Sequence, residues 1–233
     1  MRQKKLRLMK NSPLINSIPF ALAAVAAMLF FDCATTNTPA GQMENAVFRE
    51  SRPRSILVMP PVNLSPEVKA PLSFLAASAY PLAESGYYVI PAALSDQTFK
   101  QNGITVAEEA HAIEYGRLFE IFGADAALYI TITSFGISYY VIDSIVEAAA
   151  NARLVDLRSG QELWHGKVSV REGSNYGSGD LVGFLVGAAV SQIVNALSDR
   201  AHTVGRQAAY RLLSAGKKNS ILYGPYNPKY GTD

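Results

Sequence analysis

The chain of 233 residues is 49% hydrophobic and 17% charged, with a formal net charge of +2. Its single cysteine excludes an intrachain disulfide, so a folded domain must rely on its hydrophobic core. Residues 1–32 hold five of the 21 basic and one of the 19 acidic residues, which leaves 16 basic and 18 acidic groups and a net charge of −2 beyond them. The basic balance therefore comes from the first segment and gives no support to nucleic-acid binding.

Residues 1–32 have the layout of a secretory signal peptide. Five basic residues stand among the first ten, and an uncharged, nearly all apolar run follows over residues 18–31. The run contains Pro19 and is shorter than the roughly 20 apolar residues that a spanning helix needs. We therefore predict export and removal of residues 1–32. A retained membrane anchor that extends back to Leu14 is the weaker alternative.

Cys33 stands two residues after this apolar run, where lipoprotein processing needs a thiol to accept diacylglycerol. We predict that Cys33 is lipidated and holds the mature chain on a membrane. The residues before it, Phe31 and Asp32, depart from the small residues that usually precede such a cysteine. Ala34 is compatible with sorting to the periplasmic face of the outer membrane. The alternative is cleavage near Ala34 without lipid, which would give a soluble periplasmic protein.

Residues 33–53 are rich in Thr, Asn, Pro and Gly and lack an apolar period, which predicts a flexible tether. Residues 54–215 are the predicted periplasmic domain, and about 160 residues are enough for a sizeable core. Its first half alternates strands with helices. In chain order we predict strand 55–59, helix 70–84, strand 87–90, helix 92–101 and helix 107–122. Pro81 is expected to kink or split the first helix.

The sequence of the second half of the domain predicts a β-meander. Residues 126–137 are enriched in β-branched and aromatic side chains, which favours a strand. Two alternating apolar runs, 145–157 and 163–170, flank the turn-rich residues 158–161 as in a hairpin. The whole order predicts an α/β fold of the α+β sandwich type, with helices packed on a mixed sheet of about five strands.

A long helix is predicted over residues 181–213, after a glycine-rich loop at residues 172–180. Its opening is apolar nearly all round and places Gly183 and Gly187 on one face, where another helix can approach closely. We favour a buried core helix lying across the sheet. Contact with a second copy in a homodimer, or with a membrane, is the alternative.

Residues 216–233 form a predicted tail dense in Tyr, Pro and Gly. Tyr223, Tyr226 and Tyr230 lie on a segment stiffened by proline, so they offer large contact area at low entropic cost. The sequence supports two interpretations of this tail equally well. The tail is either a recognition strip for a partner or a segment that packs back on its own domain.

Residues that could carry catalysis are scarce. His111, His165 and His202 lie far apart, with no second His or Cys at ligand spacing, so a metal site is poorly supported. No Gly-x-Ser-x-Gly elbow occurs, and the glycine-rich loop lacks the lysine of a P-loop. The sequence therefore predicts a protein that is not an enzyme and holds no cofactor and no metal.

Five blocks of sequence, in this order, resemble the domain-of-unknown-function 799 family of bacterial lipoproteins, typified by a Neisseria surface-antigen candidate. They are residues 55–63, 81–89, 121–130, 154–164 and 222–231. The resemblance covers roughly residues 53 to 231. It implies a fold similar to the N-terminal domain of TolB, although a fold alone does not fix a function.

The resemblance also implies a partner class, because family members are often encoded beside a lipoprotein similar to CsgG of curli secretion. Our leading hypothesis is an outer-membrane lipoprotein that binds other envelope proteins in an assembly or secretion complex. The alternative hypothesis is a lipoprotein regulator that activates a peptidoglycan synthase.

Overall fold

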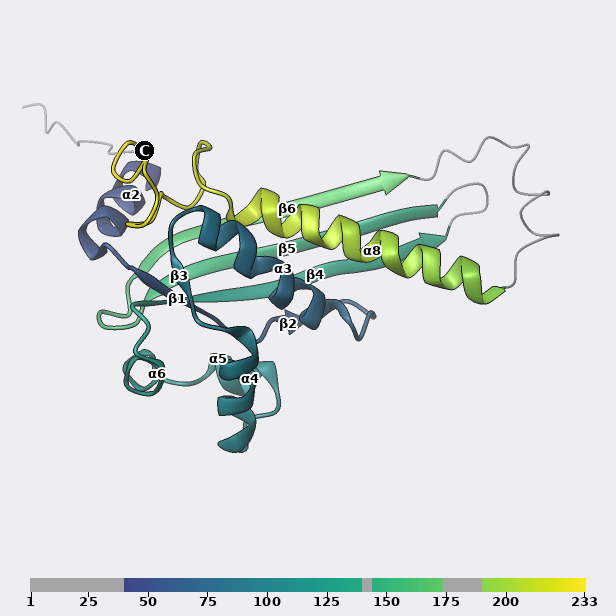
Figure 1. Ribbon diagram of the computed structural model, residues 1–233, viewed down its shortest axis with the longest axis horizontal. Helices are drawn as coiled ribbons and strands as arrows, with labels where there is room; N and C mark the ends of the chain where they lie inside the picture. The colour runs from purple at the N-terminus through teal and green to yellow at the C-terminus, as the bar shows by residue number, and fades with distance from the viewer. Residues whose placement is uncertain (1–39, 140–143, 174–189) are drawn as a thin grey trace, which may run out of the picture. The chain divides into compact units, whose positions relative to one another are not determined.

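The computed structural model describes residues 40–139, 144–173 and 190–233, and a six-stranded mixed sheet organises them (Figure 1). The strands are β1 (Ser55–Val58), β2 (Val62–Asn63), β3 (Tyr88–Val89), β4 (Ala126–Tyr139), β5 (Ser144–Asp156) and β6 (Glu162–Gly173). Their order is β3-β1-β4-β5-β6, with β2 paired to β4. The first three strands run parallel to their neighbours, whereas β4, β5 and β6 form an antiparallel meander. The predicted α/β class and the predicted hairpin are confirmed.

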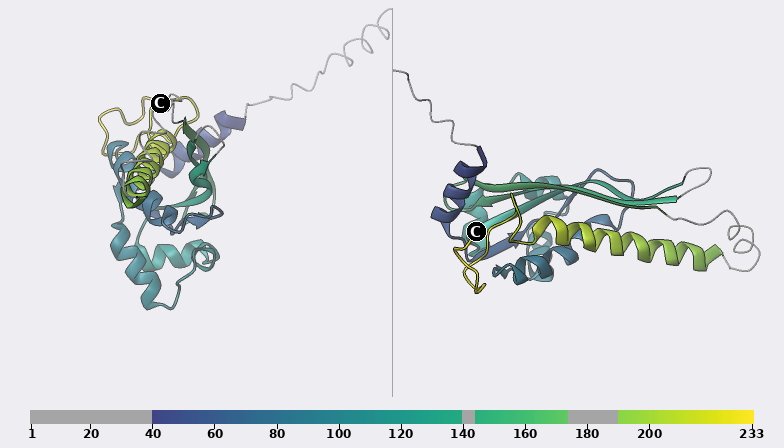
Figure 2. Two further views of the ribbon diagram at one scale, coloured as in Figure 1. Left: turned by 90° about the vertical axis from the view of Figure 1, so that its right-hand side faces the viewer. Right: turned by 90° about the horizontal axis from the view of Figure 1, so that it is seen from above.

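Helices cover the sheet on both faces. They are α2 (Ala40–Ser51), α3 (Ala70–Glu84), α4 (Ala92–Gln101), α5 (Ala107–His111), α6 (Tyr115–Phe122) and α8 (Val190–Leu213). Helix α8 contacts α3 and the three meander strands, and Figure 2 shows it running along one face of the sheet. The shorter helices α4, α5 and α6 supply the core of the opposite face. The helix predicted over residues 181–213 is described from Val190 onward, and its apolar opening with Gly183 and Gly187 lies outside the described residues.

Strand β1 shows how the sequence creates two cores. Ile56 and Val58 belong to the core under α3 and α8, while Leu57 and Met59 belong to the core under the shorter helices. Successive side chains of a strand point to opposite faces, so a strand buried on both faces becomes a continuous apolar run. Such a run was the signal that predicted this strand.

Helix α8 lies close to the meander because small residues face it. Ala148, Ala150 and Ala152 on β5 are buried in the shared core. On the helix side, a Cβ at Gly205 would lie 2.6 Å from the ring of Phe135, well inside normal contact distance. The apolar burial of these residues stabilises the antiparallel half of the sheet.

Residues 40–51 differ from the prediction. The sequence predicts an irregular tether up to residue 53, but Ala40–Ser51 form α2, which contacts β6. Phe48 is buried in the main core and fixes the helix there. The prediction of a flexible segment is therefore wrong for α2, because one buried aromatic residue gives no periodic signal. Only residues 34–39 separate Cys33 from the helix in sequence.

Three smaller differences concern the first half of the domain. Helix α3 continues past Pro81 to Glu84, so this proline does not split it. The helix predicted over residues 107–122 is two helices, α5 and α6. Strand β2 was not predicted, because two residues carry no detectable alternation.

Candidate partner-binding surface

The site residues predicted from the sequence fall into two groups. Cys33, Gly183 and Gly187 lie outside the described residues. Tyr223, Tyr226 and Tyr230 lie in the C-terminal tail, which the structure describes completely. Of the predicted partner-binding residues, the structure therefore describes only those of the tail.

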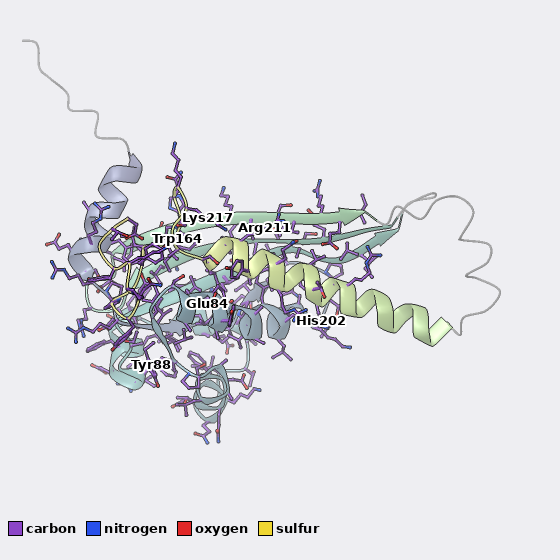
Figure 3. All side chains as sticks on the ribbon, turned by 45° about the horizontal axis from the view of Figure 1, so that its top comes forward. Glu84, Tyr88, Trp164, His202, Arg211 and Lys217 are labelled. Atoms are coloured by element: carbon purple, nitrogen blue, oxygen red, sulfur yellow. The ribbon has the colours of Figure 1, made fainter. Side chains whose placement is uncertain are left out.

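The beginning of the tail is part of the hydrophobic core. Ile221 and Leu222 are buried, and the indole Nε1 of Trp164 donates a hydrogen bond to the carbonyl oxygen of Asn219 at 3.0 Å. Figure 3 shows Trp164 beside the start of the tail. The hydroxyl of Tyr87 donates to the carbonyl of Leu222 at 2.7 Å, and burial raises the pKa of Tyr87 far above its usual value. Tyr87 therefore stays a neutral donor that holds the tail.

Two glycines let the tail cross the chain between α3 and β3. The backbone N–H of Gly224 donates to the carbonyl oxygen of Ser85 at 2.7 Å. The N–H of Tyr226 donates to the carbonyl oxygen of Gly86 at 3.1 Å. A Cβ on Gly86 would lie 2.5 Å from the nitrogen of Asn227, and one on Gly224 would overlap the carbonyl of Gly86. Gly86 also has φ of +96°, which other residues rarely adopt. The crossing depends on glycine at both positions.

Side-chain contacts fix the far end of the tail. The amide of Asn227 donates to the carbonyl of Glu84 at 2.8 Å. The carboxylate of Asp233 accepts from the N–H of Tyr223 at 2.6 Å, and Lys229 lies over the ring of Tyr223 at 5.8 Å. Of the two interpretations left open by the sequence, packing of the tail on its own domain is thus correct for its backbone.

Two of the tail's aromatic side chains nevertheless face solvent. Tyr226 is 68% exposed and Tyr230 is 44% exposed, although hydrogen bonds hold the backbone of the tail. The backbone of the tail is therefore packed on the domain, while these two rings remain accessible to a partner. Its fixed backbone keeps the two rings in a defined place.

A hollow of about 380 Å³ lies between the tail and α2, which run side by side in Figure 1. We call it the tail hollow. Its lining includes Phe48, Arg49, Arg52, Tyr87, Tyr223 and Tyr230. The guanidinium of Arg49 donates to the backbone oxygen of Asp233, which ties the helix to the tail. Aromatic rings beside arginines form a surface that suits protein recognition.

The histidines do not gather into a catalytic or metal site. His111 Nε2 donates to the carbonyl of Pro60 at 2.8 Å, and burial lowers its pKa. His202 Nδ1 lies 2.5 Å from Ser73 Oγ and connects α8 to α3, while His165 Nδ1 lies 3.0 Å from a Glu162 oxygen. Across the described ranges, no three His, Cys, Asp or Glu side chains come close enough to hold a metal ion. Each histidine has a local structural contact.

One cluster was missed by sequence reasoning. The hydroxyl of Tyr129 is buried and has no hydrogen-bond partner among the residues that the structure describes. Burial raises the pKa of Tyr129 to about 12. The guanidinium of Arg153 lies 4.3 Å from its ring centre and donates to the hydroxyl of Tyr115 at 3.3 Å. Tyr129 and Arg153 are cross-strand partners, a pairing that only the register of β4 and β5 reveals.

In the described part of the chain, no helix combines the length and apolar character required to cross a membrane.

Comparison with known proteins gives a consistent result. The chain is 48% identical over 207 residues to the "Putative lipoprotein NMB1124/NMB1162" of Neisseria meningitidis serogroup B, which covers 89% of this chain and 95% of that protein. The crystal structure of lipoprotein GNA1162 from Neisseria meningitidis has 54% sequence identity and a TM-score of 0.51. That match covers 61% of this chain and 99% of the other.

A more distant similarity is found with the C-terminal domain of LpoB from Salmonella enterica, with 17% identity and a TM-score of 0.36 over 51% of this chain and 83% of that one. At that level the match says nothing of function. The sequence profile of the GNA1162-like family, described as "Putative lipoprotein GNA1162-like", matches residues 43–226. The family predicted from the five sequence blocks is thereby confirmed, and the chain belongs to the GNA1162-like family of lipoproteins.

Proposed function

We propose that the protein is an exported lipoprotein, anchored through lipid on Cys33 at the periplasmic face of the outer membrane. Its domain binds other envelope proteins in an assembly or secretion complex and catalyses no reaction. The observation that supports this proposal most strongly is the arrangement of the C-terminal tail. Its backbone is fixed to the domain, while Tyr226 and Tyr230 remain exposed beside the tail hollow.

A fixed tail favours binding for an energetic reason. Ordering a flexible segment on binding costs free energy, and a segment that is already ordered avoids that cost. The hydrogen bonds of Gly224, Tyr226 and Asn227 order the tail in the free protein. Tyrosine also adds a large contact area with few rotatable bonds. Exposed tyrosines on this backbone are therefore suited to a partner surface.

The short link to Cys33 supports a partner in the envelope. Helix α2 begins at Ala40, so six residues lie between it and Cys33. Six extended residues span at most roughly 22 Å. A domain on such a link would remain close to the membrane that holds its lipid. We propose that its partners lie at the same membrane, with a lipoprotein similar to CsgG as a candidate and a second copy of this chain as the alternative.

Site-specific photo-crosslinking in the native bacterium tests this function. We would replace Tyr226 or Tyr230 by p-benzoylphenylalanine and identify the crosslinked protein by mass spectrometry. Truncation after Ser220 is less suitable because it removes the buried Ile221 and Leu222. The control position is Tyr210, an exposed tyrosine on α8.

We expect a discrete product with an envelope protein at positions 226 and 230 and none at 210. Absence of a product at both tail positions, or an equal product at position 210, would contradict the proposal.

A further inference from the structure

A second hollow, of about 480 Å³, lies at the β3 edge of the sheet, beside α4 and α6. We call it the edge groove. The described residues that line it are all uncharged, and they include Tyr88, Ile90, Pro91, Leu94, Ile121 and Phe122. Figure 3 shows Tyr88 at this edge of the molecule. An uncharged lining favours an apolar occupant, because a charged group would lose its water there without gaining a partner.

Three large side chains of the edge groove are exposed. Tyr88 and Leu94 are each 56% exposed, and Ile121 is 43% exposed. Single exposed apolar residues are common on protein surfaces, but three that converge on one hollow from different elements are not. Ile90 and Phe122 are partly buried against the core and support the groove from below. The groove therefore has a packed floor and an apolar rim.

The backbone of β3 indicates the shape of the occupant. Among the described strands, β3 pairs only with β1, through the N–H groups of Tyr88 and Ile90, each 2.9 Å from its acceptor. Hydrogen-bonding groups alternate in direction along a strand, so the N–H and C=O of Val89 face away from β1. An added strand can use these groups. Pro91 has no N–H and limits the addition to a few residues.

The tail is hydrogen-bonded to the chain just before the edge groove. The N–H of Tyr226 is bonded to the carbonyl of Gly86, two residues before Tyr88 in the chain. The exposed ring of Tyr226 thus belongs to a residue anchored at the beginning of the same edge.

We infer that the edge groove binds an extended, uncharged segment of a partner protein, which adds as a short strand beside β3 and places an apolar side chain between Leu94 and Ile121. This inference rests on the proposed function and deepens it, because it specifies the shape and chemistry of the bound segment. The backbone of Val89 supplies hydrogen bonds, and the groove selects against charged side chains.

A peptide-binding experiment tests the inference without knowledge of the natural partner. The probe is a short fluorescein-labelled peptide of alternating threonine and leucine, titrated with the full chain in detergent and followed by fluorescence anisotropy. A second peptide has glutamate in place of leucine. A third keeps the leucines but has N-methylated backbone amides, so it cannot donate to a strand edge.

The protein variants are Leu94→Glu and Ile121→Lys in the groove, with Leu72→Glu as the matched control. Leu94 and Leu72 are each the third residue of their helix, α4 and α3, and both are exposed. Glutamate is favourable in the first turn of a helix and lysine in the last, so the substitutions should not unfold the protein. Unchanged circular dichroism and Tm would confirm this.

We expect both groove variants to weaken binding of the leucine peptide by about tenfold or more, the effect of one well-buried interface side chain. Leu72→Glu should leave binding unchanged, and the glutamate and N-methylated peptides should bind weakly to the wild-type protein. No binding of the leucine peptide, equal loss in Leu72→Glu, or full binding of the N-methylated peptide would overturn the inference. So would self-association of the chain through the groove, abolished by Leu94→Glu.

The two proposals fail in different ways. If the peptide binds as expected but no envelope protein crosslinks to the tail, the groove stands and the proposed function fails. If envelope proteins crosslink at Tyr226 and do so equally in the Leu94→Glu protein, the function stands and the groove inference fails.

Discussion

At the scale of single residues, Gly86 and Gly224 determine whether the tail can pack. They are separated by more than half of the chain, and each occupies space that a Cβ on the other would need. The sequence identified the tail from its composition, but nothing in the local pattern showed that residue 224 meets residue 86. Such a contact depends on the complete fold. For this reason the tail's tyrosines were predictable as candidates and their packing was not.

Replacing Gly224 by alanine should therefore loosen the tail. We expect Gly224→Ala to lower the free energy of unfolding by about 2–3 kcal/mol, because the new methyl group meets the backbone of Gly86. Gly116→Ala is the control, since a Cβ there meets nothing within 4 Å and the residue lies in α6. Urea denaturation measures both. Equal stability of the two variants would contradict the crossing described here.

Asp156 is a second single residue with a predictable effect, because it contributes to the stability of the domain in acid. Burial would raise the pKa of its carboxyl, but hydrogen bonds from Ser51, Ser159 and Arg158 outweigh burial and hold the pKa below its usual 3.8. A carboxyl with a lowered pKa in the folded state stabilises that state above its unfolded pKa. This stabilisation is lost as the pH falls below about 3.8 and through the folded value.

We expect the free energy of unfolding of the wild type to fall more steeply than that of Asp156→Asn as the pH is lowered from 5 towards 2, roughly the range over which a carboxyl of lowered pKa is protonated. Urea denaturation at several pH values measures this difference. Parallel pH profiles for the two proteins would show that Asp156 does not titrate as described.

At the scale of elements, the sequence predicted best the strands that carry an extended pattern of apolar residues. Strand β1 was predicted from a continuous apolar run, and the β5–β6 hairpin from two alternating apolar runs that flank a turn. Helix α2 was not predicted, since its docking depends on the burial of Phe48. The edge groove was not predicted either. Tyr88, Leu94 and Ile121 belong to three elements that only the fold brings together.

Phe48 should hold α2 on the domain. We expect Phe48→Ala to release the helix, because loss of a buried phenylalanine costs about 3–5 kcal/mol. Trypsin would then cut faster after Arg49, while the rest of the domain stays resistant. Leu72→Ala removes an exposed apolar side chain on α3 and serves as the control. Unchanged cleavage in Phe48→Ala would indicate that other contacts fix α2.

At the scale of the whole molecule, we propose that a lipid anchor at Cys33 holds a domain with a surface for partners. The domain provides a fixed tail, the tail hollow and the edge groove, and residues 34–39 are a short link to Cys33. One acyl chain binds a membrane only marginally, whereas two or more hold firmly, at about 0.8 kcal/mol for each buried CH₂ group. We propose that attachment of the protein depends on the number of acyl chains at Cys33.

The intact mass of the protein extracted from membranes is the sharpest test of lipidation at Cys33, because it reports the cleavage site and the acyl chains together. We predict the mass of residues 33–233 plus a diacylglyceryl group, with or without a further acyl chain on the amino group of Cys33. The mass of an unmodified chain that begins near Ala34, or of a chain that retains residues 1–32, would contradict this prediction.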